Sequence, residues 1–322
     1  MNSGAPQRQV RIGADAAGLR LDRALAGLTP EGLRGRRRRI AGGGVLLNGK
    51  PCLEAARHLR AGDVVTLAPA EAPSETPEAQ ARLLGRQGDF CFLFKGAGLH
   101  SAALAGKAAD SLEARLPALC APVSGPDEKP ELLQRLDEMT SGIVCAALTP
   151  EAARAFRAAE AAGECEKRYL ALLTGALAAP MTARWRLDTS GRRTTRLMND
   201  EAGPVRWTEF HPLHVWEGEP CGSLCALPGA ASAPSALTLA GCRIRRGARH
   251  QIRAHAAGLG HPLYGDTRYA GAPSAAPGRF FLHHGLLAWP GHACSAPPPW
   301  PWLAACLPED ALDRARAWLE PG

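Results

Sequence analysis

Long apolar runs and nucleotide-binding glycine motifs are missing from this chain, and tyrosine is scarce. No run approaches the roughly 20 apolar residues that span a bilayer, and residues 1–9 lack the apolar region of a secretory signal. We therefore expect a cytoplasmic protein without a membrane segment. The sequence contains neither a P-loop nor a GxGxxG motif, which leaves nucleotide hydrolysis and dinucleotide redox chemistry without support. We accordingly expect no bound cofactor.

Zinc-ligand spacing is also missing. The ten cysteines include no CxxC pair, and Cys91, Cys145 and Cys242 lie in apolar runs typical of buried strands. We interpret them as reduced thiols of a cytosolic protein. Cys221 and Cys225 are a weak metal-site candidate, but their Gly/Pro-rich surroundings favour a chance spacing. Five histidines also match no zinc motif: His250, His255, His261, His283 and His284. We expect no metal.

Positive charge is concentrated at the amino-terminal end. The 322 residues, of which 46% are hydrophobic, suffice for one large domain and a small one. Residues 1–67 hold 12 Lys/Arg and 5 Asp/Glu, whereas the whole chain holds 38 and 31, so the remaining 26 of each sign cancel. This asymmetry predicts a polyanion-binding module joined to a near-neutral body.

The first 67 residues predict a small α/β module. Its expected elements are a strand at 10–12, a helix at 19–26, a helix from Thr29 to Ile40, a strand at 45–47, a hairpin turn at Asn48–Gly49 and a strand at 63–67. Thr29, Pro30 and Glu31 supply an N-cap, a first-position proline and a first-turn acid. The glycines at 42–44 would end that helix, and Asn-Gly is a strong hairpin signal.

Five arginines crowd the second predicted helix: Arg34, Arg36, Arg37, Arg38 and Arg39. A solvated basic face is one interpretation, although like charges three and four residues apart destabilise a helix. Phosphate contacts explain the arginines better, because we expect no acid to compensate them. The order RLDRAL, arginine-rich helix, GGGVLLNGKP and AGDVVTL over residues 9–67 resembles the S-four-like RNA-binding domain. This resemblance implies an RNA partner.

The rest of the chain predicts a linker and a large domain. Residues 68–88 are rich in Ala, Pro and Glu, which is typical of a semi-flexible linker. In the large domain, 89–322, strands are expected at 90–95, 143–148, 166–175, 208–216 and 236–245, and helices at 152–162, 250–257 and 308–319. Strands dominate and helices do not alternate with them, so we expect an α+β fold with a mostly antiparallel sheet.

Asp137 is the strongest catalytic candidate. It follows Arg135 in QRLDEMTSG and precedes an apolar strand, where a carboxylate needs a compensating charge. Hydroxyl and backbone donors of the Thr-Ser-Gly turn could hold its loop. Arg253 lies one helical turn after His250, and its guanidinium could keep the carboxylate ionised through a bidentate contact. Tyr169 is an ordinary strand aromatic or a stacking face for a base. Together these residues predict an acidic catalyst in a basic, RNA-facing cleft.

Four segments resemble, in order, the motifs of the RluA-type pseudouridine synthases: QRLDEMTSG, CEKRYLALLTG, RGARHQIRAHAAGLGHPLYGDTRYAG and RFFLHHGLLAW. FKGAGLH at 94–100 is similar to the opening segment of that family. The resemblance covers about residues 89–290 and implies an isomerase that converts uridine in RNA to pseudouridine without metal or cofactor. Family members with this amino-terminal module imply large-subunit ribosomal RNA as the substrate, and transfer RNA is the alternative.

The resemblance also implies roles for single residues. Asp137 would be the essential aspartate, acting as a nucleophile or as the base that forms a glycal. Arg253 would pair with it, and Tyr169 would stack on the uracil. Arg135 would lie beside the flipped-out nucleotide, and Leu282 against the base. The remaining expected RNA contacts are His250, Arg249 and the five arginines of the amino-terminal helix.

The chain departs from the family pattern at three places. Gln134 stands where histidine is usual, and Ala248-Arg249 replaces Arg-Thr or Arg-Ser, so Arg249 or Arg246 would supply the missing charge. A Gly/Pro/Ala/Ser-rich insertion between residues 216 and 237 predicts an exposed loop. The substitutions at Gln134 and Ala248 support a second hypothesis, a catalytically inactive RNA-binding or ribosome-assembly factor.

A third hypothesis is an aspartate-dependent hydrolase. Such an enzyme needs a second carboxylate or a metal, and Glu138 would point to the opposite face of an extended segment. Nothing in the sequence suggests an obligate assembly, so a monomer is expected.

Overall fold

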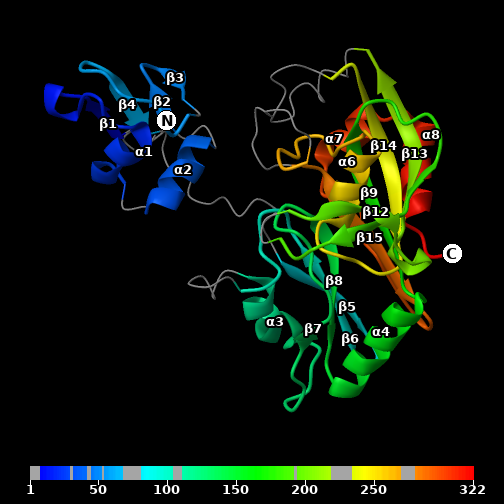
Figure 1. Cartoon of the computed structure of the whole chain (residues 1–322). Coiled ribbons are helices and arrows are strands. Elements are labelled where there is room, and N and C mark those ends of the chain that lie inside the picture. The colour runs from blue at the N-terminus through cyan, green and yellow to red at the C-terminus, as the bar shows by residue number, and fades with distance from the viewer. Residues whose placement is uncertain are drawn as a thin grey trace. The chain divides into compact units, whose positions relative to one another are not determined.

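The computed structural model describes residues 8–29, 32–41, 45–52, 54–67, 81–103, 111–191, 194–218, 234–269 and 280–322. The chain divides into two compact units, Met1–Ser74 and Glu75–Gly322 (Figure 1). The linker prediction is wrong for its last part, because strand β5 (Arg82–Gln87) pairs with β6 (Phe90–Lys95) in the sheet of the second unit. Within the described part of the chain, no helix has both the length and the apolar character needed to cross a membrane.

The first unit is a four-stranded antiparallel sheet with short helices. Leu21, Leu25, Ile40, Val45 and Val65 form its buried centre, and the predicted order of strands and helices is confirmed. Its elements are β1 (Arg8–Arg11), η1 (Ala14–Ala16), α1 (Leu21–Ala24), η2 (Leu25–Gly27), α2 (Leu33–Ala41), β2 (Val45–Leu47), β3 (Lys50–Pro51) and β4 (Val64–Leu67), with sheet order β1-β4-β2-β3. The residues expected to start and end the second helix, Pro30, Glu31 and 42–44, lie outside the described part.

Asp22, in the first unit, is a fully buried carboxylate that forms ion pairs with two arginines. Asp22 accepts hydrogen bonds from Arg20 Nη2 at 2.9 Å and from Arg37 Nε at 2.7 Å. The hydrogen bond from Arg20, together with that from Arg37, lowers the pKa of Asp22 to about 2 although burial opposes the shift. The expectation that no acid compensates the arginines of α2 is therefore wrong for Arg37, because its acid lies 15 residues earlier in the chain.

The second unit is built on one long sheet. Its strands run in the order β10-β13-β14-β9-β15-β8-β6-β5, with β16 paired to β15 and β7 to β8. Among the described strands, β15 and β8 pair in parallel and the other pairs of this sheet are antiparallel. The α+β prediction with a mostly antiparallel sheet is confirmed.

The remaining bounds are β7 (Glu131–Leu132), β8 (Ser141–Ala147), β9 (Glu166–Thr174), β10 (Met181–Ala183), β13 (Thr208–Glu217), β14 (Ala236–Ile244), β15 (Leu282–Trp289) and β16 (His292–Ser295). A separate two-stranded ribbon joins β11 (Trp185–Asp188) to β12 (Arg196–Glu201). The helices are α3 (Leu112–Cys120), α4 (Pro150–Ala162), η4 (Pro204–Arg206), α6 (Gln251–Gly258), α7 (Pro301–Cys306) and α8 (Glu309–Trp318).

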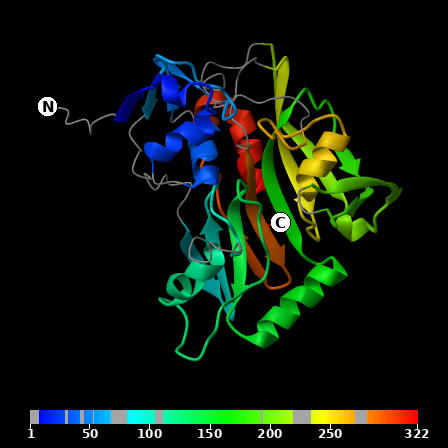
Figure 2. The ribbon, with the colours of Figure 1, turned by 60° about the vertical axis from the view of Figure 1, so that its left-hand side comes forward.

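Side chains of β9 alternate between two cores, since successive residues of a strand point to opposite faces. Leu170 and Leu172 pack with α8 through Ala311 and Ala315. Tyr169 and its same-face neighbours pack with α6 instead. Figures 1 and 2 show α6 and α8 on opposite sides of β14. This alternation directs Tyr169 toward the α6 side of the sheet.

The parallel pair β15–β8 requires a glycine. Gly142 has φ 123°, and a Cβ there would lie 2.2 Å from the backbone oxygen of His284. A side chain at this position would therefore push β15 away from β8. The close approach lets Nδ1 of His284 contact the carbonyl of Ile143 at 2.6 Å, and the imidazole is completely buried.

His284 should make stability depend on pH. Burial, with smaller contributions from Lys167 and His283, lowers the pKa of His284 from 6.5 to about 3. When the pH falls below 6.5, the unfolded chain takes up the proton first, so the folded state loses stability between pH 6.5 and about 3. The loss is about 1.4 kcal/mol per pH unit for such a group. We expect His284→Phe to flatten the dependence of unfolding free energy on pH in this window, measured by urea denaturation; equal slopes for wild type and variant would refute this.

Candidate active site

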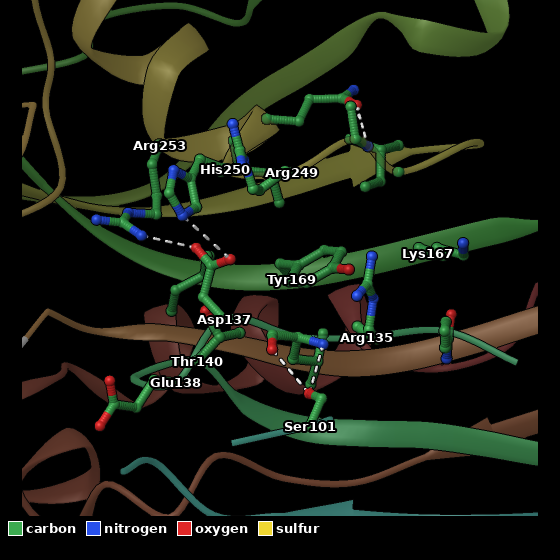
Figure 3. Close-up of a pocket in the computed structure, with 18 of the residues that line it drawn as sticks. Ser101, Arg135, Asp137, Glu138, Thr140, Lys167, Tyr169, Arg249, His250 and Arg253 are labelled. Atoms are coloured by element: carbon green, nitrogen blue, oxygen red, sulfur yellow. Dashed lines mark hydrogen bonds and ion pairs between the residues drawn. The ribbon is translucent and has the colours of Figure 1, made fainter. Parts of the chain in front are cut away.

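A cavity of about 580 Å³ in the second unit brings together residues that are far apart in sequence (Figure 3). Asp137 comes from the loop between β7 and β8, Tyr169 from β9, Arg253 from α6 and Leu282 from the first position of β15. The sheet order explains the convergence, since β9 and β8 both pair with β15. The sequence-predicted residues of the second unit therefore share one cavity.

Arg253 binds two carboxylates at once. Its Nη1 donates to Asp137 Oδ2 at 2.7 Å, and its Nε and Nη2 donate to Asp266 at 2.6 and 2.9 Å. The side chains of Arg253 and Asp266 are 7% and 1% exposed. Burial alone would lower the pKa of Arg253, but the hydrogen bonds and charges of Asp266 and Asp137 outweigh it, so this pKa is raised. The predicted contact between Asp137 and Arg253 is present as a single hydrogen bond, but the bidentate contact expected for Asp137 is wrong, because Nε and Nη2 of Arg253 bind Asp266 instead.

The loop that presents Asp137 is fixed through its backbone. Ser101 Oγ donates to the carbonyl of Leu136 at 2.7 Å and accepts from its N–H at 2.9 Å. The N–H of Thr140 donates to the carbonyl of Asp137 at 3.1 Å, which confirms the backbone part of the predicted turn. These contacts fix the backbone of the loop and leave the oxygens of the Asp137 carboxylate free for other partners.

A buried ammonium group lies beneath the same loop. Nζ of Lys95 donates to the carbonyls of Gly96, Leu99 and Glu138 at 2.9, 2.8 and 3.1 Å. Burial lowers the pKa of Lys95 to about 7, and the charges of Asp137 and Glu138 partly oppose the shift. Three carbonyl oxygens match the three donors of the protonated amine. Lys95 thereby ties the end of β6 to the loop.

Tyr169 lies beside Asp137 on the cavity floor (Figure 3). Its ring stacks on His284 of the neighbouring strand, with centroids 4.4 Å apart and 17° between the planes. Burial, followed by the charge of Asp137, raises the pKa of Tyr169. The side chain is therefore a neutral phenol, and the stacked imidazole of His284 holds its ring in place.

Basic side chains surround the carboxylate. Arg135 and Lys167 lie near Tyr169, and His250 approaches Asp137 from α6 (Figure 3). Lys167 is 3% exposed and pairs with Glu160. Arg249, the alternative to Arg246 as a substitute charge, lines the cavity. The lining holds four Lys/Arg side chains against the three carboxylates of Asp137, Glu138 and Glu160, a slight positive excess that suits a polyanionic chain.

Arg249 is only partly available for RNA. Its Nη2 donates to the carbonyls of Thr189 at 2.8 Å and of Gly191, so it braces the turn of the β11–β12 ribbon. The prediction of a simple phosphate contact did not foresee this bracing, because the ribbon was not predicted.

The other predicted positions differ in their surroundings. Gln134 lines the cavity, and its Nε2 is buried without a hydrogen-bond partner among the described residues. Glu138 points away from Asp137 in Figure 3 and lies 3.6 Å from His100 Nε2. The arginines of α2 belong to the other unit, where the side chains of Arg34 and Arg38 lie outside the described part. Residues 219–233, which include Cys221 and Cys225 and most of the predicted insertion, are also outside it.

Sequence reasoning missed Asp266, Lys95 and Ser101. Asp266 stands in the quoted segment HPLYGDTRY, 13 residues after Arg253. An acid that close to a buried arginine was a usable signal, since a buried guanidinium usually needs more than one acceptor. Lys95 ends an apolar strand, where a lone lysine also signals a partner. No sequence signal identifies Ser101.

The fold of this chain occurs in other proteins of known structure. Two solved human structures share the fold: RNA pseudouridylate synthase domain containing 1, with TM-score 0.51, 22% identity and coverage of 76% of this chain and 98% of that one; and RNA pseudouridylate synthase domain containing 4, with TM-score 0.52, 18% identity and coverage of 73% and 93%.

The family follows from the sequence comparisons. A family model described as RNA pseudouridylate synthase matches residues 92–258, so the chain belongs to this isomerase family. A ribosomal large subunit pseudouridine synthase D of Xanthomonas campestris is 31% identical over 280 residues, which are 82% of this chain and 75% of that protein. The protein of the same name from Zymomonas mobilis is 26% identical over 292 residues, 88% and 84% of the two chains.

Asp266 should support stability through Arg253. Asp266→Asn leaves a buried guanidinium facing a neutral amide, and removing one partner of a buried ion pair is expected to lower the unfolding free energy by about 3–5 kcal/mol. The control is Asp313→Asn, whose exposed carboxylate pairs with Arg316 on α8 and should change stability by less than about 0.5 kcal/mol. Urea denaturation measures both; a similar small change for the two variants would contradict the structural role of Asp266.

Proposed function

We propose that this protein isomerises specific uridines of large-subunit ribosomal RNA to pseudouridine, with Asp137 as the reacting carboxylate. The observation that carries the proposal is the carboxylate of Asp137, held by Arg253 at 2.7 Å and placed beside Tyr169 in a basic cavity. The names of the Xanthomonas and Zymomonas relatives support the substrate. The retained Asp137, Tyr169 and Arg253 argue against an inactive RNA-binding factor.

Either route of the isomerisation uses one oxygen of Asp137. As a nucleophile it bonds to C1′ while the C1′–N1 electron pair moves onto the uracil; as a base it takes the C2′ proton while the same pair leaves. The uracil turns, C5 bonds to C1′, and Asp137 is released or returns the C2′ proton. The proton lost from C5 is balanced by one gained at N1. No other reactant is consumed.

The surrounding residues would hold the flipped nucleotide. Flipping costs a few kcal/mol, which stacking and phosphate contacts can offset. The ring of Tyr169 would stack on the uracil, and Leu282 would give the base an apolar contact. Arg135 would fill the space left in the RNA or bind a phosphate.

The first unit would add affinity for the same RNA. Its basic helix α2 and small sheet support an S-four-like RNA-binding domain, joined near residues 68–81 to the catalytic domain. The eight described cysteines are free thiols and six of them are buried, which supports a cytoplasmic site of action. A monomer is proposed, since the cavity of one chain holds all the named catalytic groups and needs none from a second copy.

The catalytic role of Asp137 is tested by replacing its carboxylate with the neutral amide of asparagine. Asp137→Asn removes the reacting charge and should abolish pseudouridine formation, by about 10³-fold or more, while RNA affinity stays within about twofold because the side chain makes no phosphate contact. Glu138→Gln is the matched control: Glu138 also lines the cavity, but its carboxylate points away from Asp137 and lies near His100, so the variant should remain active. Carbodiimide (CMC) modification and primer extension on large-subunit ribosomal RNA and on transfer RNA measure the product. Unchanged product with Asp137→Asn would refute the role, and product only in transfer RNA would change the substrate.

The arginines of α2 are tested by salt dependence. Replacing Arg34, Arg36, Arg38 and Arg39 by Gln spares Arg37, which pairs with Asp22. Each lost phosphate contact should reduce the slope of log affinity against log salt by about 0.7–0.9. The control replaces four arginines on α4 and α8, Arg154, Arg157, Arg314 and Arg316, which changes net charge equally. If both variants show the same slope in an RNA-binding titration, α2 is not an RNA-binding surface.

A further inference from the structure

The second oxygen of Asp137 faces a histidine held in an unusual backbone conformation. Oδ2 accepts the hydrogen bond from Arg253, whereas Oδ1 lies 3.7 Å from Nε2 of His250 (Figure 3). His250 has φ 55° and ψ 20°, and among the described residues Asn48 is the other non-glycine with positive φ. Asn48 occupies a hairpin turn, where asparagine tolerates this conformation. For histidine such a backbone conformation is strained.

The strained backbone is anchored on both sides. Oε1 of Gln251 accepts from the N–H of Ala248 at 2.9 Å, and the carbonyl of His250 accepts from the N–H of Ala254 at 2.9 Å. The result is that His250 acts as N-cap residue of α6 with its ring turned toward Asp137 rather than toward the helix amides. Strain of this kind at a functional site persists only where surrounding contacts enforce it.

The other ring nitrogen of His250 is held by a tyrosine. Nδ1 lies 2.9 Å from the hydroxyl of Tyr269, and the same hydroxyl oxygen accepts from the N–H of Thr195 at 2.8 Å. The Tyr269 ring also lies against Arg253, whose guanidinium carbon is 5.2 Å from the ring centre. Tyr269 thus touches both residues of α6 that face Asp137.

The proton positions follow from these contacts. The Tyr269 oxygen already accepts a hydrogen bond from Thr195, so its own hydrogen is placed to be donated to Nδ1 of His250 at 2.9 Å. Nδ1 is then unprotonated, and in the neutral ring the proton is on Nε2. The carboxylate favours the same arrangement, because a lone pair on Nε2 would face the negative Oδ1. Burial lowers the pKa of His250 although the charge of Asp137 opposes the shift, and nearby arginines add to the lowering, so the neutral ring is favoured over the cation.

We infer that Tyr269 and His250 are positioning residues for Asp137: the Tyr269 hydroxyl fixes His250 as the Nε2–H tautomer and aims that proton at Oδ1. This inference rests on the proposed function. Arg253 then restrains the carboxylate, and His250, one helical turn away, orients its second oxygen by electrostatic attraction rather than by a hydrogen bond. The contact of 2.7 Å holds Oδ2 firmly, whereas 3.7 Å leaves Oδ1 able to turn to a ribose. Oδ1 is therefore the oxygen that reacts.

The tautomer can be tested without any activity assay. Long-range ¹H–¹⁵N NMR of protein labelled with [¹⁵N]histidine distinguishes protonated from unprotonated ring nitrogens, and the His250 signals are those lost in His250→Gln. We expect Nε2–H for His250 in the wild type and loss of the pure Nε2–H tautomer in Tyr269→Phe, which keeps the ring but not the hydroxyl. An Nδ1–H tautomer in the wild type, or an unchanged tautomer in Tyr269→Phe, would overturn the inference.

Kinetics separate positioning from a merely structural role. Tyr269→Phe should lower kcat for pseudouridine formation about 10- to 100-fold, the scale of a misoriented catalytic group, with KM and RNA affinity within about twofold. Tyr264→Phe, in the same segment but packed in the core on the α8 side, should leave kcat unchanged. An unchanged kcat in Tyr269→Phe would refute the inference.

Two substitutions of His250 distinguish its ring from its backbone. Asparagine suits the left-handed conformation but is too short to reach Oδ1, whereas the amide nitrogen of glutamine can occupy the place of Nε2. We expect His250→Gln to retain at least about tenfold more kcat than His250→Asn. Equal losses would mean that only the backbone matters and would sink the positioning role. A wild type that forms no pseudouridine would refute the proposed function, and the NMR result would still decide the tautomer.

Discussion

A buried guanidinium shared by two carboxylates is the interaction on which the rest of the site depends. Arg253 lies over the rings of Phe280 and Tyr269, with distances of 4.3 and 5.2 Å to their centres, and it binds Asp137 and Asp266. Arg253 therefore connects α6 with three other segments. These are the loop before β8, through Asp137; the segment of Asp266 and Tyr269; and the residues just before β15, through Phe280. Removing any one partner would leave charge unpaired where water cannot solvate it. One ion pair on one element could not align the carboxylate with the cavity; a guanidinium braced from several elements can.

The loop of Asp137 is held mainly by contacts to its backbone, which leaves the carboxylate available. Ser101 fixes Leu136, and Lys95 binds the carbonyl of Glu138 from below. Among the described residues, the side chain of Asp137 meets Arg253 of α6 and the N-cap residue His250. The backbone of the loop thus carries its structural hydrogen bonds, and the carboxylate keeps an oxygen available for reaction. A carboxylate whose oxygens were all hydrogen-bonded would have to lose one of those hydrogen bonds before it could react with a substrate. The sheet contributes in the same way, because the two-residue period of β9 places Tyr169 in the cavity while Leu170 and Leu172 build the core on the other face.

Much of the architecture follows from local patterns. The helix at α4 begins at the predicted Thr149 cap, whose Oγ1 accepts from the N–H of Ala152, and ends at Gly163 in a left-handed conformation. The strand at β6 has the predicted bounds. What failed were short or polar elements: β5 in the supposed linker and the ribbon β11–β12 carry few apolar residues, so their pairing is decided by partners distant in the sequence. The acid that compensates Arg37 was missed for the same reason, because no local spacing links it to Asp22.

The sequence by itself determined the two-part organisation and the class of fold, because capping, strand periodicity and charge placement are local properties that the amino acids express wherever they fold. It also nominated Asp137, Tyr169 and Arg253, through the motifs in which they stand and the family that those motifs resemble. Only the tertiary structure decided that Asp266 completes the Arg253 pair, that Arg249 braces the ribbon, and that Tyr269 reaches His250. These are contacts between elements separated by many residues, and their geometry depends on strand order and register. No periodicity within a single segment encodes that order, since it is set by how the whole sheet buries its two faces.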